Sequence, residues 1–536
     1  MRPMPANPTP ATPTPATPAH SVPERIVVVG FGPVAARFVD ELQPAAAAGV
    51  AEVTVIGEEG QPAYNRVLVA DLGVGRTTLA SMQLADPDEL ALDGIRVLLG
   101  THATRIDRSR RIVHTAERGP LPYDRLILAT GARAAIPNLT GLNPDPLHPV
   151  LPRGVTALRD LADAERLSAA VRGRKRIVVL GGGVLGLEAA LAASEEGATV
   201  TVVHHGGRPL GRQIDAGGGA TLSAVLRGGG LRLAPNARAT GIEADDDGSF
   251  RALLLEDGSA VDGDLLVLAC GARARRELAE GAGLATGNGI LVDHRLAALH
   301  TEHVFAIGDC AEVRCPDAAC EECARADGPS GLIAPGWRQA DWLAASFRSR
   351  LLGESTPLPL TVERPGVILL KARAVNLALA GNVQREPWES VAWDAGDGGR
   401  APIDVSLWAD PARGRYVKMC TREGVLEGFV ALGMPRAAAE LTLLFESGAE
   451  LPADRSVLLR LDGPESSLGA PGSSAGPEST LCRCAGVSRG TVEEAILGGC
   501  ATVEQVSKST RAGTGCGGCR DSVRRLVEQH FAGVGA

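Results

Sequence analysis

A glycine turn near the start of the chain constrains its fold more than any other feature. Residues 26–29 are four apolar β-branched residues suited to a strand buried on both faces, and Gly30, Gly32 and Ala35 follow them. Small residues at this spacing let the backbone turn tightly into a helix, whose free N–H groups and dipole favour a diphosphate. The same spacing also serves simply to pack a helix closely on a strand. Glu58, at the end of the next apolar strand, favours a dinucleotide because its carboxylate can accept a hydrogen bond from a ribose hydroxyl.

Two further positions extend this first site. Arg66 lies in a polar turn after the acid, where it either clamps a diphosphate or is a solvated loop charge; we favour the clamp. The apolar strand at 125–129 ends at Thr130 and Gly131, which form either a close backbone passage or an ordinary crossover turn.

A second glycine turn follows. The apolar strand at 176–180 leads into Gly181, Gly183 and Gly186, and the residues after them favour a helix. Two such units in one chain are much more specific than one. The next strand ends in His204, where an acid would bind the ribose of NAD, so the sequence leaves the choice between NADH and NADPH open.

Composition narrows the class of function. Aromatic residues make up 3% of the 536 residues and the net charge is −9, which argues against a nucleic-acid partner, because nucleic acids favour basic surfaces and aromatic stacking. No segment approaches the roughly 20 apolar residues of a membrane span, so we expect no membrane partner. Residues 1–24, rich in Pro, Thr and Ala, predict a disordered tail and lack the apolar segment of a signal peptide. These features predict a cytoplasmic protein.

The cysteines are bunched, which in a reducing compartment suggests metal or redox centres. A Gly-, Ser- and Pro-rich segment at 461–480 predicts a flexible linker. Beyond it lie two closely spaced pairs of thiols, which predict a 2Fe-2S cluster, with structural zinc as the alternative. The four candidate metal ligands are Cys482, Cys484, Cys516 and Cys519.

A second group of thiols has a less distinctive spacing. Cys310, Cys315, Cys320 and Cys323 either hold zinc or an iron-sulfur cluster, or form a surface loop of reduced thiols beside one unrelated buried cysteine. We favour the second interpretation. Between the two groups, residues 356–460 predict short strands and a helix that begins near Pro435 and ends by Gly448. The role expected of this unit is packing, with a homodimer as one possibility.

These motifs give the chain from residue 25 to about 350 a resemblance to the two-dinucleotide-fold flavoprotein reductases, in which an NAD(P) fold interrupts an FAD fold. The resemblance implies that Asp309, in a Gly-Asp pair after an apolar strand, binds the ribityl chain of FAD. Its other FAD positions match Gly30, Gly32, Ala35, Glu58, Arg66, Thr130 and Gly131, and its NAD(P)H positions match Gly181, Gly183, Gly186 and Glu188. We add His204 to the predicted NAD(P)H-binding residues.

The remaining segments also resemble known domains. Residues 356–460 are similar to the C-terminal domain of rubredoxin-reductase-like flavoproteins, and residues 481–536 to the bacterioferritin-associated ferredoxin-like (BFD-like) domain, which implies a 2Fe-2S cluster on its four cysteines. No cysteine precedes Cys270, so a disulfide reductase activity is not expected, because thiol-disulfide exchange needs a thiolate near the flavin. Hydride transfer needs no side-chain acid or base, and we therefore predict no catalytic residue.

The predicted fold is α/β, with two dinucleotide-binding (Rossmann-like) domains, an α+β C-terminal interface domain and a small helical four-cysteine iron-sulfur domain. The predicted boundaries are a tail at 1–24, an FAD domain at 25–150 and 288–355, an NAD(P) domain at 151–287, the interface domain at 356–460, a linker at 461–480 and the BFD-like domain at 481–536.

The order of these domains resembles the amino-terminal part of the assimilatory NAD(P)H nitrite reductase large subunit and the assimilatory nitrate reductase electron-transfer subunit. The chain stops before the sirohaem and four-iron domains of the former, so we expect it not to reduce nitrite itself. The resemblance implies electron transfer from NAD(P)H through FAD and the 2Fe-2S cluster to a separate nitrate or nitrite reductase. Two alternatives remain open: a reductase for rubredoxin, ferredoxin or an oxygenase, and a redox- or iron-sensing docking module.

Overall fold

The protein is described here from a computed structural model. The structure describes residues 22–142, 145, 150–315, 317, 320, 323, 328–358, 360, 366–372, 375–389, 401–462, 476–482, 485–515 and 517–534. The predicted tail up to residue 21, the linker residues 463–475 and two predicted cluster ligands, Cys484 and Cys516, lie outside the described residues.

The first sheet is parallel and contains the first glycine turn. Its strand order is β19-β7-β1-β2-β3. In chain order the strands are β1 (Glu24–Val29), β2 (Ala51–Ile56), β3 (Ile95–Leu98), β7 (Arg125–Leu128) and β19 (Val304–Ala306). The last of these strands comes from beyond the second sheet, so the first sheet is completed only after the chain has built the second.

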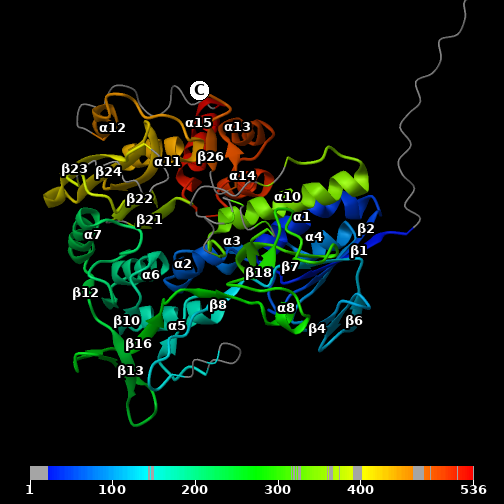
Figure 1. Cartoon of the computed structure of the whole chain (residues 1–536), viewed down its shortest axis with the longest axis horizontal. Coiled ribbons are helices and arrows are strands. Elements are labelled where there is room, and N and C mark those ends of the chain that lie inside the picture. Colours follow the sequence, from blue (N-terminus) through cyan, green and yellow to red (C-terminus); the bar gives the residue numbers. More distant parts are fainter. Residues whose placement is uncertain are drawn as a thin grey trace, which may run out of the picture.

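Helices α1 (Pro33–Ala47) and α10 (Ile333–Leu352) pack against one another beside this sheet (Figure 1). The rings of Phe38 and Phe347 meet edge to face with their centroids 6.0 Å apart. Arg37 on α1 also donates to Asp341 on α10 at 2.8 Å. The packing therefore holds α10, which comes after both parallel sheets in the sequence, against α1, the helix of the first glycine turn.

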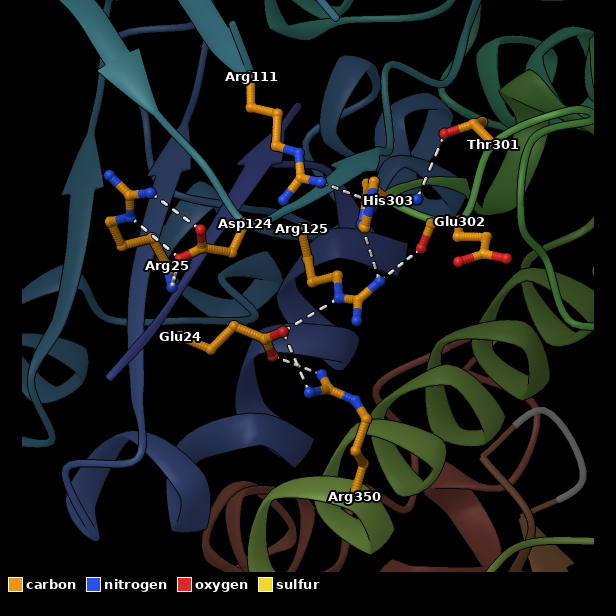
Figure 2. A network of polar contacts seen from close by, with 9 residues as sticks. All are labelled: Glu24, Arg25, Arg111, Asp124, Arg125, Thr301, Glu302, His303 and Arg350. Carbon is orange, nitrogen blue, oxygen red and sulfur yellow. Dashed lines mark hydrogen bonds and ion pairs between the residues drawn. The ribbon is translucent and has the colours of Figure 1, made fainter. Parts of the chain in front are cut away.

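A network of charged side chains joins the amino-terminal ends of the strands, opposite the glycine turn (Figure 2). Glu24 accepts hydrogen bonds from Arg125 at 3.0 Å and from Arg350 on α10. Arg25 donates to Asp124 at 2.9 and 3.0 Å. The other members of the network are Arg111, Thr301, Glu302 and His303. Its ion pairs join the start of β1 to the start of β7 and to the end of α10.

The second sheet repeats the parallel design with the order β12-β11-β10-β16-β9. Its strands are β9 (Val155–Thr156), β10 (Arg176–Leu180), β11 (Thr199–Val203), β12 (Arg232–Ala234) and β16 (Leu265–Leu268). Its helices are α5 (Leu161–Arg172), α6 (Val184–Glu195) and α7 (Ala216–Gly228). Smaller sheets flank the two large ones: β4-β5-β6 (Ala103–Asp107, Ile112–Thr115, Gly119–Pro122) and β13-β14-β15 (Ala239–Ala244, Phe250–Leu255, Ala260–Asp262).

The third large sheet is antiparallel, in the order β21-β22-β25-β24-β23. Its strands are Ile368–Ala372, Val375–Gly381, Asp404–Asp410, Arg415–Arg422 and Val425–Leu432 in chain order, and they are followed by α11 (Pro435–Ser447) and α12 (Ser456–Arg460). The helix predicted from Pro435 is confirmed, and Gly448 ends it in the left-handed conformation. Lys418 on β24 is fully buried and donates to Asp215, beside α7, at 3.1 Å. This ion pair joins the third sheet to the start of α7, a helix of the second sheet.

The chain ends in a small helical unit, which we call the C-terminal module. It comprises β26 (Thr480–Cys482), β27 (Val487–Ser488), α13 (Arg489–Leu497), α14 (Val503–Thr510) and α15 (Arg520–Val534), and it has its own apolar core. Helix α13 begins at Arg489, where the Ser488 hydroxyl accepts from the backbone N–H of Thr491 and caps the first turn. The α/β fold class predicted from the sequence is confirmed.

None of the described helices combines the length and the apolar composition that crossing a bilayer requires.

Candidate functional site

The first glycine turn leaves no room for a side chain at Gly30. Gly30 has a φ of +104°, and a Cβ atom built on it would lie 2.2 Å from the carbonyl oxygen of Ala129. Gly32 begins α1 without a side-chain cap, and the space around its Cα is open. The N–H groups of the first turn of α1 therefore face a cradle that a ligand backbone or diphosphate can approach, which fits the predicted FAD.

Arg66 lies over this turn. Its Nε atom is 4.0 Å from the position of a Cβ on Gly32. The guanidinium pairs with Glu59 and donates to the Tyr64 hydroxyl at 2.9 Å, and that hydroxyl donates to Glu59 at 2.8 Å. The position suits a diphosphate clamp, and the neighbouring carboxylate and phenol keep the guanidinium oriented.

The two carboxylates predicted to bind FAD each meet an arginine that sequence analysis missed. Arg159 donates to Asp309 at 2.7 Å and to the carbonyl oxygen of Ala132 at 3.2 Å. Arg275 pairs with Glu58, and its carbonyl oxygen accepts from the Thr130 hydroxyl at 2.7 Å. No motif in the sequence marks either arginine, because each reaches its carboxylate from a distant segment.

Asp309 is held against the first turn of α1. It lies in a 3-10 turn at Gly308–Cys310, and the backbone N–H of Gly308 donates to Gln339 of α10 at 2.7 Å. A Cβ on Gly308 would come within 3.1 Å of Val34, the second residue of α1. Asp309, Gly32 and Arg66 thus come from three distant segments and gather at the carboxyl end of the first sheet.

The second glycine turn is built like the first. Gly181 has a φ of +127°, and its Cβ would lie 2.2 Å from the carbonyl oxygen of Ala269. A Cβ on Gly186 would lie 2.5 Å from the carbonyl oxygen of Gly181, while the surroundings of Gly183 are open. Glu188 lies half-buried on the same helix, α6. This cradle fits a pyridine nucleotide.

His204 ends the strand beside this turn. Its side chain is buried, and a Cβ on Gly182 would lie 3.2 Å from it. Burial lowers the pKa of His204, so its ring is neutral at pH 7. A neutral imidazole does not repel the 2′-phosphate of NADPH as a carboxylate would, so the geometry leaves both nucleotides open.

The two nucleotide folds meet through a pair of related strands. The sequence Ala-Thr-Gly-Ala-Arg-Ala at 129–134 follows β7, and Ala-Cys-Gly-Ala-Arg-Ala at 269–274 follows β16. Strands β8 (Ala132–Ala134) and β17 (Ala272–Ala274) pair antiparallel, with Arg133 opposite Arg273. The alanine that begins each segment supplies the carbonyl oxygen beneath one glycine turn. The segments beneath the two glycine turns therefore continue into one pair of strands, β8 and β17.

The C-terminal module places two of its four predicted ligands together. Cys482 and Cys519 are both buried in its apolar core, beside Val487 and Val492. Gly517, between Cys516 and Cys519 in the sequence, has a φ of +70°, which a non-glycine residue rarely adopts. Two buried thiols, Cys482 on β26 and Cys519 beside a glycine-rich loop, fit the predicted 2Fe-2S cluster.

The segment between α14 and α15, which carries Cys516 and Cys519 in the sequence and which we call the cysteine loop, docks on the part of the chain that contains the first glycine turn. The side-chain amide of Asn65, which is 1% exposed, donates to the carbonyl oxygens of Thr514 and Gly515, the latter at 2.6 Å. Arg511 pairs with Glu41 at 2.7 Å and with Asp40, both on α1. Burial, and then the nearby Arg37, lower the pKa of Arg511 to about 10, so it keeps its charge at pH 7.

Two further features define this contact. Lys508 donates to Glu89 at 2.7 Å, and a hollow of about 420 Å³ lies between the module and the segments at α1 and residues 65–90. The module carries a net charge of +2 at residues 481–536, against −11 for the remaining residues. At this contact, basic side chains of the module meet acidic side chains of the remaining chain, in agreement with the signs of the two net charges.

Two protein families match this chain. The family described as pyridine nucleotide-disulphide oxidoreductase matches residues 24–328, and the BFD-like [2Fe-2S] binding domain matches residues 480–529. A nitrite reductase [NAD(P)H] of Bacillus subtilis is 27% identical over 95% of this chain and 58% of its own length. The assimilatory nitrate reductase electron transfer subunit of the same organism is 26% identical over 94% of this chain and 59% of its own. The chain thus spans less than two thirds of either relative.

Among solved structures, the complex of putidaredoxin reductase with putidaredoxin matches with a TM-score of 0.66 at 22% identity. The match covers 83% of this chain and 97% of that one. This likeness supports the fold. The cofactors implied by the family matches, FAD, NAD(P)H and a 2Fe-2S cluster, are the ones that the two glycine turns and the buried cysteines fit. The chain belongs to the pyridine nucleotide-disulphide oxidoreductase family and ends in a BFD-like [2Fe-2S] binding domain.

Proposed function

We propose that this protein is an NAD(P)H-dependent electron-transfer reductase that serves a separate terminal enzyme, a nitrate or nitrite reductase. The observation that carries the proposal is the docking of the cysteine loop on Asn65, the neighbour of Arg66 at the first glycine turn. A module docked there brings the thiol-bearing loop to the FAD domain without help from another protein.

We assign the site residues as the sequence predicts. The FAD site comprises Gly30, Gly32, Ala35, Glu58, Arg66, Thr130, Gly131 and Asp309; the NAD(P)H site comprises Gly181, Gly183, Gly186, Glu188 and His204; Cys482, Cys484, Cys516 and Cys519 ligate the cluster. Arg159 and Arg275 join the first site because they orient its carboxylates. The predicted domain boundaries, the homodimer and the cytoplasmic location stay predictions.

Bound FAD would supply the ability to take a hydride from the nicotinamide, and a bound 2Fe-2S cluster would supply one-electron transfer. The protein's part is to bind and orient. The glycines let the ligand backbones approach, Arg66 offsets diphosphate charge, and Asp309 is held by Arg159 so that its carboxylate faces one direction. Asn65 and Arg511 hold the cysteine loop in place.

The identity of the acceptor rests on the relatives. Two of them are named for nitrite reduction and for electron transfer in assimilatory nitrate reduction, and the similarity extends over nearly the whole of this chain. A terminal nitrate or nitrite reductase is therefore the acceptor that we propose. A small electron carrier is the alternative acceptor.

The test is an anaerobic titration of the full chain with NADH and, separately, NADPH, in which flavin bleaching and the EPR signal of the reduced cluster are followed. Both centres should be reduced, and the chain should reduce cytochrome c. A truncation should remove residues 463–536 and keep Asp462, which accepts from the backbone of Arg436 and Ala437 and caps α11.

The truncated protein should keep flavin reduction and lose most of its turnover with cytochrome c and with a nitrate reductase. Cys500→Ser, which removes a thiol outside the predicted ligands, should behave as wild type. Full turnover after truncation would contradict a relay and favour the sensing module instead.

A further inference from the structure

A cluster of metal-binding side chains lies outside the sites described above. His294, Cys315, Cys320 and Cys323 place their ligand atoms within 4.8 Å of one another. The Nε2 atom of His294 lies 3.5 Å from the sulfur of Cys320 and 3.5 Å from that of Cys323. We propose that these four residues, which we call the His294 cluster, bind one structural zinc ion.

The membership of the cluster differs from the sequence pattern. Cys310 belongs to the predicted spacing, but its thiol is fully buried and donates to the carbonyl oxygens of Leu128 and Ile307, each at 3.3 Å. His294, which no spacing rule selects, takes the fourth place. Three thiols and one imidazole form a common donor set of structural zinc sites.

The distances fit a single tetrahedral ion. With zinc-sulfur bonds of about 2.3 Å and zinc-nitrogen bonds of about 2.0 Å, tetrahedral angles place the nitrogen about 3.5 Å from each sulfur. The two recorded distances from His294 are 3.5 Å. A two-iron cluster separates the ligands of different irons by the length of the cluster, whereas here all four ligand atoms lie within 4.8 Å.

The fold brings two of the ligands to one edge. Strands β18 (Ile290–Val292) and β20 (Ala311–Val313) pair in parallel, with Val292 opposite Val313. His294 and Cys315 each lie two residues beyond these partners, so both leave the small sheet at the same end. The backbone N–H of Arg314 donates to the carbonyl oxygen of Val292 at 2.7 Å and fixes this register next to the ligands.

The other two ligands close a loop. Cys323 is 5% exposed, and its sulfur accepts from the backbone N–H of Cys315 at 3.1 Å, a contact that stabilises a thiolate. The chain returns at Gly328 and Pro329, where a Cβ on Gly328 would lie 3.1 Å from Asn288. The chain therefore lies beside the segment that leaves β18 at Cys315, and beside the segment that leads into β18 at Gly328.

The position gives the ion its role. The loop follows the turn that carries Asp309 and precedes α10, which packs on α1 at the first glycine turn. A zinc ion there cross-links the path from Asp309 to α10. None of the four ligands is a predicted FAD residue, and a closed set of four protein ligands is typical of structural zinc.

The experiment uses the full chain, purified without chelators, with zinc and iron measured per chain by mass spectrometry. Because vacant cluster cysteines can also take zinc, the measurement is repeated in Cys482→Ala/Cys519→Ala. Both proteins should carry about one zinc per chain, as expected for one site closed by four protein ligands. Cys482→Ala/Cys519→Ala should lose its iron.

In the same background, Cys320→Ser/Cys323→Ser should lose the zinc, while Cys270→Ser, a thiol change outside the cluster, should retain it. Flavin content reports whether each variant folds. His294→Ala should weaken zinc retention against a competing chelator, and His294→Cys, which restores a fourth ligand, should recover it. Cobalt substitution should give thiolate-to-cobalt absorption that Cys320→Ser weakens.

Three results would overturn the proposal: no zinc in the folded wild type, zinc unchanged in Cys320→Ser/Cys323→Ser, or iron instead of zinc at these residues.

Discussion

The side-chain amide of Asn65 donates to the carbonyl oxygen of Gly515 at 2.6 Å, although the two residues are 450 positions apart in the chain. Asn65 precedes Arg66 at the first glycine turn, and Gly515 belongs to the loop that carries the last two predicted cluster ligands. One buried contact thus joins the first predicted cofactor site to the last.

Asn65→Asp should undock the module and leave the turn at Arg66 folded. The aspartate keeps the oxygen that accepts from Val67 at 3.0 Å, but it cannot donate to Thr514 or Gly515. Losing a buried hydrogen bond costs about 1–3 kcal/mol, so the equilibrium constant for docking should fall about 5- to 150-fold. Stopped-flow reduction by NAD(P)H should show normal flavin bleaching and slower cluster reduction. Unchanged cluster reduction would contradict docking as the productive geometry.

Arg511→Gln should also slow the reduction of the cluster, because it removes the ion pairs with Asp40 and Glu41 on α1. These pairs are partly exposed, so rising ionic strength should also slow the wild-type step, and the variant should lose most of that salt dependence. Arg524→Gln is the matched control, because Arg524 pairs with Asp521 inside the module. Equal salt dependence in wild type and Arg511→Gln would show that charge does not hold the contact.

Gly30→Ala should abolish FAD retention, because the added Cβ would lie 2.2 Å from the carbonyl oxygen of Ala129. Gly181→Ala should keep FAD and weaken NAD(P)H binding, because its clash lies under the second turn. Gly49→Ala is the control: Gly49 also has a positive φ, +69°, but nothing lies within 4 Å of its Cβ position. Flavin content and nucleotide titration measure the three variants, and loss of FAD in Gly181→Ala would argue against separate sites.

The Arg25–Asp124 pair should make stability depend on acid pH. The hydrogen bond from Arg25 lowers the pKa of Asp124 from 3.8 to about 2. The charged pair therefore stabilises the folded state above pH 3.8, and this contribution is lost as the pH falls towards 2. Because the Asp124 side chain is 33% exposed, screening leaves about 1 kcal/mol. Asp124→Asn should lower the unfolding midpoint at pH 7, and the difference from wild type should shrink in acid. A difference that persists unchanged in acid would rule out the ionised pair as its source.

Much of the local structure follows from spacing alone. The glycines at 30, 32, 181, 183 and 186 are selected by the close approach of a helix to a strand, and that requirement is local to some ten residues. The helix from Pro435 to Gly448 was likewise predictable, because proline favours the first turn and glycine the left-handed end. The fold class could be predicted because both turns and the cysteine pairs are short, contiguous patterns.

The partners of these residues were decided by the tertiary structure. Arg159 reaches Asp309 across 150 residues, and His294, rather than Cys310, joins the three cysteines because β18 and β20 pair in register. The docking of the cysteine loop on Asn65 has no sequence signature either. Spacing along the chain sets how a strand turns into a helix, whereas contacts between distant segments depend on how whole sheets and domains pack.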